Sequence, residues 1–131
     1  MALLSREQIV EADDRKYDVV ACPEWGGEVR LRSITGTQRD AFEQSLMQGN
    51  GADRKLNLRH ARSKLIVLSA VDADGRSLFT SEDLNALGRK NAAPLDRLFD
   101  AAKALAGIGD KDVERLTEDF GETRDDDATS D

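Results

Sequence analysis

The segment from Leu56 to Ile108, LNLRHARSKLIVLSAVDADGRSLFTSEDLNALGRKNAAPLDRLFDAAKALAGI, carries most of the information about the fold of this chain. Its last part predicts a helix with one apolar side, because apolar residues recur there at intervals of three, one, three and three. These residues are Leu95, Leu98, Phe99, Ala102 and Leu105. Its first part predicts a long helix over 56–71, whose apolar end at 65–71 we expect to be buried on most sides. The two helices together are the predicted core.

Short motifs connect these two helices. The sequence DADG at 72–75 predicts a turn that needs the permissive backbone of its glycine. After the turn, Leu78 and Phe79 are expected to return to the core. Ser81 is expected to cap a further helix over 81–90, since acidic residues follow it in the first turn.

A β-hairpin is predicted near the N-terminus. The segments YDVVAC (17–22) and EVRLRS (28–33) contain strand-forming residues on either side of a turn with proline and glycine. Two strands alone are marginally stable in water, so we expect the hairpin to lie on the helices or to pair with another chain. Short helices are predicted on both sides of it, the first capped by Ser5 and the second by Thr35 or Thr37.

The remaining segments complete the predicted fold. Glycines and polar residues at 49–55 predict a flexible loop, and apolar spacing at 110–120 predicts a last helix. Residues 121–131 are acidic and lack large apolar side chains, so we expect a disordered tail. We therefore predict a single domain over 1–120, mainly α with a small N-terminal β-hairpin at about 17–33 (α+β). Four to five short helices surround one thin aliphatic core.

The composition limits what the protein can bind. Of its 131 residues, 39% are hydrophobic and only 5% aromatic, so a partner or a second copy is expected to cover part of the apolar surface. The net charge is -7, and residues 118–131, with seven acids and one base, account for -6 of it. The nearly neutral body argues neither for nucleic acid nor for a membrane surface. No signal peptide and no apolar run of roughly 18 residues is found, so we expect a cytoplasmic protein.

No set of residues predicts catalysis, a cofactor or a metal site. The chain holds one cysteine, Cys22, and one histidine, His60, which excludes an internal disulfide and leaves a zinc-type site without ligands. Cys22 lies inside a predicted strand, and we interpret it as a small buried hydrophobic residue. The DADG turn does not fit an EF-hand calcium loop, since Ala70 would occupy position one when Gly75 occupies position six. An enzyme is therefore the least favoured class.

Two features are candidates for contact with a partner. Five basic residues without an intervening acid include three that are spaced to share one face of the predicted helix. The five are Arg54, Lys55, Arg59, Arg62 and Lys64, and the three on one face are Lys55, Arg59 and Arg62. This face either neutralises the acidic tail, docks an acidic or amphipathic helix, or binds nucleic acid, which is the least favoured of the three. Trp25 at the hairpin tip is either a contact anchor or a residue that folds back on its own helices.

Four segments together resemble the tail assembly chaperones of long-tailed bacteriophages, the proteins that correspond to the short G form of lambda-like phages. They are LLSREQI (3–9), PEWGGEVRLRSITGTQRDAFE (23–43), VDADGRSLFTSEDLNALG (71–88) and LDRLFDAAKALAGI (95–108). The likeness lies in their pattern and order and covers about Leu3 to Phe120. It implies a helper in the host cytoplasm that binds the tape measure protein, a long helical chain with apolar faces, and helps to recruit tail tube subunits.

The resemblance also implies a homo-oligomer and a longer form, made by ribosomal frameshifting, that contacts the tail tube protein. By helix-in-groove contact, the tape measure protein is expected to bind either the apolar side that runs from Leu95 to Leu105 or the basic face with Arg59 and Arg62. The alternative is a structural phage tail or connector protein that is retained in the virion. Both are binding functions without a cofactor.

Overall fold

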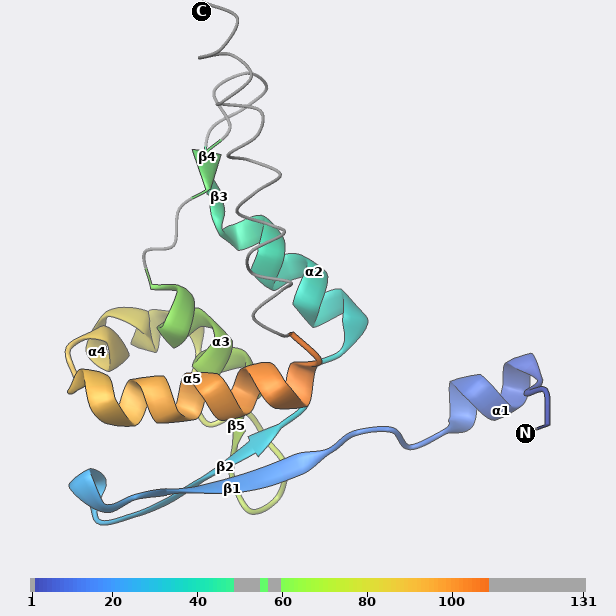
Figure 1. The fold of residues 1–131 in the computed structure, drawn as a ribbon, viewed down its shortest axis with the longest axis horizontal. Coiled ribbons are helices and arrows are strands. Elements are labelled where there is room, and N and C mark those ends of the chain that lie inside the picture. Colours follow the sequence, from blue (N-terminus) through green and yellow to red (C-terminus); the bar gives the residue numbers. More distant parts are fainter. Residues whose placement is uncertain (1, 49–54, 57–59, 109–131) are drawn as a thin grey trace, which may run out of the picture.

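The structure, a computed structural model, describes residues 2–48, 55–56 and 60–108 of the chain (Figure 1). These residues form five α-helices, two short 3-10 turns and two small antiparallel sheets. In chain order the elements are α1 (Arg6–Glu11), β1 (Tyr17–Cys22), η1 (Pro23–Trp25), β2 (Gly27–Arg32), α2 (Gly36–Ser45), β3 (Met47–Gln48), β4 (Lys55–Leu56), α3 (Ala61–Ser69), β5 (Ala70–Val71), η3 (Ser81–Asp83), α4 (Leu84–Gly88) and α5 (Ala92–Ala106). The predicted α+β class, with helices and a small N-terminal hairpin, is confirmed.

The predicted hairpin forms because side chains alternate between two faces along β1 and β2, and one of those faces can be buried. Val20 lies opposite Val29 in the antiparallel ladder. Val20, Cys22 and Leu31 join the core on the helix side of the sheet, and Cys22 and Leu31 have no exposed surface. The hairpin therefore lies on the helices, with both strands in contact with α5. The interpretation of Cys22 as a small buried residue is confirmed.

The predicted helix over 56–71 is too long at both ends. His60 has a left-handed backbone (φ 62°), which a right-handed helix does not contain, so α3 begins only at Ala61. After Ser69 the chain becomes extended, and Ala70 and Val71 pair with β2 as the third strand of the sheet. A continuous apolar run fits a buried strand as well as a buried helix, and sheet pairing takes the last two residues of this run.

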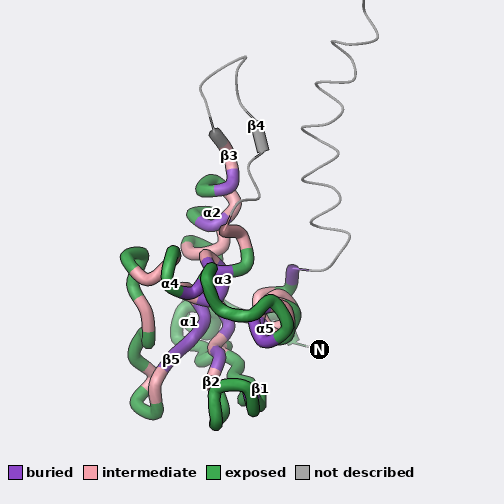
Figure 2. The backbone as a smooth tube through the Cα atoms, turned by 90° about the vertical axis from the view of Figure 1, so that its left-hand side faces the viewer, coloured by how far each residue is buried: buried purple, intermediate pink, exposed green. Residues whose placement is uncertain are grey.

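The longest helix, α5, closes the core against α3 and the hairpin. Leu98 of α5 keeps 1% of its surface exposed, and Leu65 and Ile66 of α3 keep none. The predicted end of the helix at Gly107 is confirmed, with the left-handed backbone (φ 72°) of a helix cap. Figure 2 shows buried residues along α3 and β5 and on one side of α5, whose other side is exposed.

The helix α2 begins with a capping box. The Thr35 hydroxyl accepts a hydrogen bond from the Gln38 N–H (3.1 Å), and the Gln38 side-chain oxygen accepts one from the Thr35 N–H (2.9 Å). Thr35 is therefore the cap, and Thr37 lies inside the first turn. Phe42, in the middle of this helix, is the single aromatic side chain among the buried core residues that the structure describes.

A second sheet follows α2, in which β3 pairs antiparallel with β4. Lys55 therefore has an extended backbone, although the sequence places it in the predicted loop next to a long helix. Most of that loop, at 49–54, lies outside the described residues. The predicted helix at 110–120 and the acidic tail at 121–131 also lie outside them.

The turn predicted at 72–75 forms. The Asp72 carboxylate accepts hydrogen bonds from the N–H groups of Asp74 (2.8 Å) and Arg76 (3.0 Å), and Gly75 has a left-handed backbone (φ 83°). Beyond the turn, the prediction that Leu78 returns to the core is wrong: its N–H bonds to the strand β5, but 48% of the residue stays exposed.

The cap of the next helix also differs from the prediction. Phe79 packs against the core as expected, but Thr80, not Ser81, is the capping residue. The Thr80 hydroxyl accepts from the Glu82 N–H (3.3 Å), and the Asp83 carboxylate accepts from the Thr80 N–H (2.9 Å). The first turn after Thr80 is the 3-10 turn η3, from which α4 continues.

The N-terminal helix α1 lies apart from the other elements (Figure 1). Its predicted capping box is confirmed, since the Ser5 hydroxyl accepts from the Gln8 N–H (3.2 Å) and the Gln8 side chain accepts from the Ser5 N–H (2.8 Å). No residue of α1 is buried, and residues 12–14 that connect it to the body are exposed as well. The helix is thus ordered by local bonds and not by packing.

Candidate interaction surfaces

The predicted apolar side of α5 belongs to the core. Leu95, Leu98 and Ala102 have exposed fractions of 6%, 1% and 1%. Phe99 and Leu105 are partly buried and pack against the same core. The apolar periodicity of this helix is therefore satisfied inside the molecule, and the single chain has no free surface for a partner at the three buried positions.

Charged side chains surround the outer part of α5. Arg62 of α3 forms an ion pair with Asp96 of α5, and its guanidinium carbon lies 6.0 Å from the centre of the Phe99 ring. The ammonium group of Lys103 lies 4.9 Å from the same ring centre. Arg62 and Phe99, both predicted to contact a partner, are thus already used to join α3 to α5.

The predicted basic face is not one face of a helix. Lys55 belongs to β4 and Arg62 to α3, so the two lie on different elements, and Arg59 lies outside the described residues. Lys64 of α3 donates to the backbone carbonyl of Ser45 in α2 (2.8 Å). Because His60 has a left-handed backbone, the chain on its two sides is not one continuous helix, which the predicted basic face required.

Trp25 lies at the tip of the hairpin, and its role as a contact anchor stays a prediction. It ends the turn η1, 38% of its surface is exposed, and it is not among the buried core residues. Gly26 follows it with a left-handed backbone (φ 78°) and ends the turn, and the return strand β2 begins at Gly27.

An ion pair fixes this tip to α5. The Arg97 guanidinium donates two hydrogen bonds to the Glu24 carboxylate (3.0 Å each) and one to the Ala21 carbonyl (3.2 Å). The hydrogen bonds from Arg97 lower the pKa of Glu24 to about 2. Trp25 is therefore held at a defined place on the surface.

The hairpin face that points away from the helices combines apolar and basic side chains. Tyr17 and Val19 are 46% and 54% exposed and lie opposite Arg32 and Arg30 in the ladder. The Arg30 guanidinium carbon lies 4.2 Å from the centre of the Tyr17 ring. We call these four residues the outer hairpin face.

The two arginines of this face are held by neutral partners. Arg30 donates to the Ala73 carbonyl (3.1 Å) and Arg32 to the Gly75 carbonyl (2.8 Å), both in the turn after β5. Neither arginine forms an ion pair with any described residue. Their positive charges therefore remain available to a carboxylate of a partner.

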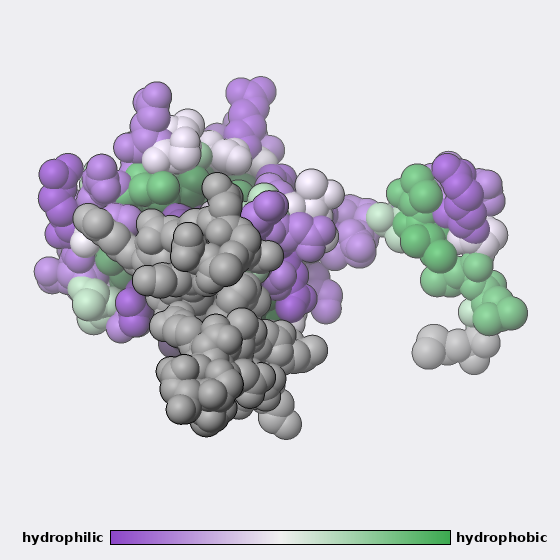
Figure 3. All heavy atoms as spheres, turned by 90° about the horizontal axis from the view of Figure 1, so that it is seen from above, coloured by the Kyte–Doolittle hydropathy of each residue, from purple (hydrophilic) through white to green (hydrophobic). Residues whose placement is uncertain are grey.

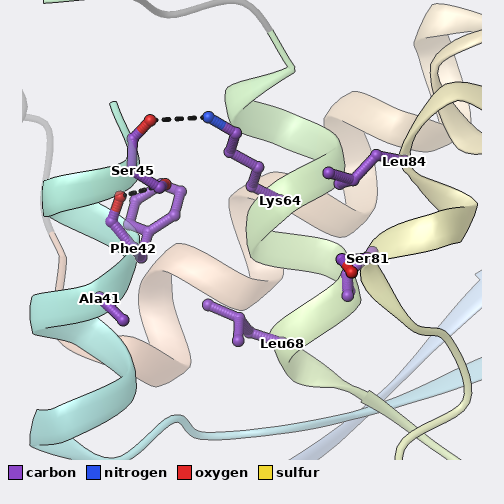
Figure 4. A pocket seen from close by; sticks show the side chains of 8 residues that line it. Ala41, Phe42, Ser45, Lys64, Leu68, Ser81 and Leu84 are labelled. Atoms are coloured by element: carbon purple, nitrogen blue, oxygen red, sulfur yellow. Dashed lines mark hydrogen bonds between the residues drawn. The ribbon is translucent and has the colours of Figure 1, made fainter. Parts of the chain in front are cut away.

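A further surface, which the sequence did not predict, is a pocket between α2, α3 and the start of α4 (Figure 4). Its volume is about 220 Å³ and its lining is almost entirely apolar. We call it the α2–α3 pocket; its lining residues are Ala41, Phe42, Ser45, Lys64, Val67, Leu68, Ser81 and Leu84. Figure 4 shows Ala41 and Phe42 on α2 turned toward Leu68 on α3, with Lys64 at the rim. The apolar spacing of each helix hints at such a surface, but only the packing of three separate segments creates it.

The described residues offer little for chemistry. They contain no group of three or more histidine, cysteine or acidic side chains that could hold a metal ion. None of the helices in that part of the chain has both the length and the hydrophobicity that crossing a membrane requires.

Comparison with solved structures finds a similar fold. No protein-family model matches the chain, and no curated protein matches it either. Among solved structures, the fold is similar to that of the tail assembly chaperone of bacteriophage HK97, with a TM-score of 0.53 and 21% sequence identity. The match covers 79% of this chain and 95% of the HK97 chain. The likeness in fold that the four sequence segments predict is confirmed.

Proposed function

We propose that this protein is a bacteriophage tail assembly chaperone that binds the tape measure protein in the host cytoplasm. Through a longer frameshifted form of the chain, it also helps to recruit tail tube subunits. The observation that carries the proposal is the similarity in fold to the HK97 tail assembly chaperone over 79% of this chain. Exposed apolar side chains support a protein that acts by contact with other chains.

The outer hairpin face is the best candidate for the tape measure contact. Tyr17 and Val19 lie two residues apart on one strand, at a spacing of roughly 7 Å, close to the 5–6 Å between neighbouring apolar residues on one helix face. Arg30 and Arg32 lie beside them with charges that no described carboxylate neutralises. An amphipathic helix with acidic residues next to its apolar stripe matches this face. Trp25, fixed nearby at the hairpin tip, adds an aromatic anchor.

Co-expression with a fragment of the tape measure protein tests the proposal. We expect the wild-type chain to keep the fragment soluble and to copurify with it. Val19→Glu and Arg30→Glu should each abolish copurification, because the first places a charge on the apolar part and the second reverses a charge. Thr37→Glu, an added acid at an exposed position of α2, is the matched control and should behave like wild type.

The outcomes separate the function from the site. If the wild-type chain neither solubilises nor binds the fragment, the proposed function is wrong. If both hairpin variants remain folded by circular dichroism and bind like the control, the function stands and the outer hairpin face is not the contact.

Mass spectrometry of purified virions distinguishes the chaperone from a structural tail or connector protein. A chaperone leaves the particle, so we expect no peptides of this chain in virions that contain the tube and tape measure proteins. Stoichiometric amounts of the chain in the particle would establish the structural role instead.

A further inference from the structure

Residues 2–14 form an arm whose apolar side chains are not covered by any described residue. Leu3, Leu4, Ile9 and Val10 keep 100%, 66%, 59% and 66% of their surface exposed. Figure 3 shows them as a group of hydrophobic residues on the arm, separated from the body of the molecule. Single exposed apolar residues are common on proteins, but four large ones on one short segment mark a contact site. We call residues 2–14 the N-terminal arm.

The helix of the arm is already ordered without a partner. Its capping box satisfies the first N–H groups of α1 without help from the body. Leu4 and Ile9 occupy the positions before the cap and at the fourth helical residue, the spacing of a hydrophobic staple. A helix that is already ordered loses less conformational entropy when it binds than a disordered segment does.

The α2–α3 pocket has the properties that would suit this arm. It is lined almost entirely by apolar atoms, and its volume of about 220 Å³ exceeds the roughly 150 Å³ of a cavity that holds one benzene molecule. It therefore has room for about one or two large aliphatic side chains.

The charges of the two surfaces are complementary. The arm carries four acids (Glu7, Glu11, Asp13 and Asp14) and one base (Arg6), so its net charge is 1 − 4 = -3. The pocket rim carries the ammonium group of Lys64, which is held by a neutral carbonyl. Electrostatic complementarity of this kind fixes the orientation of a docked helix.

The attachment of the arm directs it away from its own body. Just after the arm, both backbone groups of Lys16 form hydrogen bonds with Ser33. The Lys16 N–H donates to the Ser33 hydroxyl (2.9 Å), and the Lys16 carbonyl accepts from the Ser33 N–H (2.8 Å). Arg15 adds a hydrogen bond to the Ser33 carbonyl (3.1 Å). The exposed connector at 12–14 spans at most about 10 Å beyond this anchor, and α1 points outward from it (Figure 1).

We propose that the arm of one copy of this chain docks in the α2–α3 pocket of a second copy, with the apolar side of α1 in the pocket and its acids near Lys64. The two surfaces are the uncovered apolar arm and the apolar pocket of the same sequence, so the arm of one copy can fill the pocket of the next. The inference does not depend on the proposed function, because the outer hairpin face uses other residues.

Sedimentation analysis over a range of concentrations tests this docking. The wild-type chain should change from monomer to larger species as its concentration rises. Leu4→Asp together with Ile9→Asp, or Ala41→Glu in the pocket, should raise the midpoint concentration by about tenfold or more, as expected when anchors of an interface are lost. Ala12→Asp in the arm and Gln44→Glu on α2 make similar charge changes outside the two apolar surfaces, and both should behave like wild type.

Site-directed cross-linking identifies which copy holds the arm. Chains with Ile9→Cys are mixed with differently tagged chains with Ser45→Cys and oxidised; Cys22 can stay, since it has no exposed surface. Disulfides between the two kinds of chain support the proposal. A wild-type chain that stays monomeric at all concentrations overturns it, and so does self-association that neither the arm nor the pocket variant weakens. A disulfide that forms inside a single dilute chain carrying both cysteines also overturns it, because the arm would then occupy its own pocket.

Discussion

Replacement of Leu98 by alanine tests whether the apolar side of α5 belongs to the core or forms a contact surface, through its effect on the free energy of unfolding. Leu98 keeps 1% of its surface and belongs to the core shared by α3, α5 and the hairpin. Truncation of a fully buried leucine removes its transfer free energy and leaves a cavity, at a cost of about 2–5 kcal/mol. We expect about 3–4 kcal/mol here, because helix and sheet enclose the site and limit its collapse. That is a large share of a total stability of about 5–15 kcal/mol.

Urea unfolding followed by circular dichroism measures this cost. The midpoint should fall strongly for Leu98→Ala while the slope of the transition stays unchanged. Ile9→Ala is the matched control: it also truncates a large aliphatic residue on a helix, but at a position that is 59% exposed, and its effect should stay within about 0.5 kcal/mol. Both proteins are compared at concentrations where the wild type is monomeric. A cost below about 1 kcal/mol for Leu98→Ala, together with loss of tape measure binding, would refute the assignment of this face to the core.

Three further outcomes follow from local contacts. In Arg97→Ala the pKa of Glu24 should rise from about 2 toward its ordinary value of 4.5, so that the fluorescence of the neighbouring Trp25 titrates at a clearly higher pH in the variant than in the wild type. Because the pKa is lowered in the folded protein, the stabilising effect of this pair is present above pH 4.5 and is lost as the pH falls toward 2. Thr35→Ala should lower the free energy of unfolding by about 1 kcal/mol in urea titrations, since it removes the cap of α2. His60→Gly should raise it by up to about 1 kcal/mol, since glycine adopts the left-handed backbone without steric cost; a decrease would show that the imidazole makes the larger contribution.

Local physics accounts for the parts of the fold that the sequence predicts well. The capping boxes at Ser5 and Thr35 and the helix end at Gly107 depend on residues within one turn of each other. The hairpin depends on alternation along two strands joined by a short turn. Each of these structures forms from bonds whose partners are visible as neighbours in the sequence.

The errors concern contacts between distant segments. The run 65–71 is apolar throughout, so its periodicity fits a buried helix and a buried strand equally well. What makes Ala70 and Val71 a strand is pairing with Leu31 and Arg30, roughly 40 residues earlier in the chain. A single sequence does not show such a partner, and the predicted helix is too long for that reason.

The candidate site illustrates the same limit. Apolar periodicity shows that a helix face needs cover, but it does not show what covers it. For α5 the cover is α3 and the hairpin of the same chain, so most of the residues predicted to bind a partner stabilise the fold. The α2–α3 pocket joins residues from 41–45, 64–68 and 81–84, and no motif within one of these segments predicts it.

Among the described residues, the apolar surface that the fold does not cover lies mainly on the N-terminal arm and on the hairpin. If Leu3, Leu4, Ile9 and Val10 were fully buried against a second copy, each would contribute about 1.5–3 kcal/mol, or about 6–12 kcal/mol in total as an upper bound. Loss of translational and rotational freedom opposes association by an estimated 4–15 kcal/mol. The two terms are of similar size, so the predicted contact between copies is weak and reversible. A permanent structural subunit would bury a larger and more continuous apolar surface.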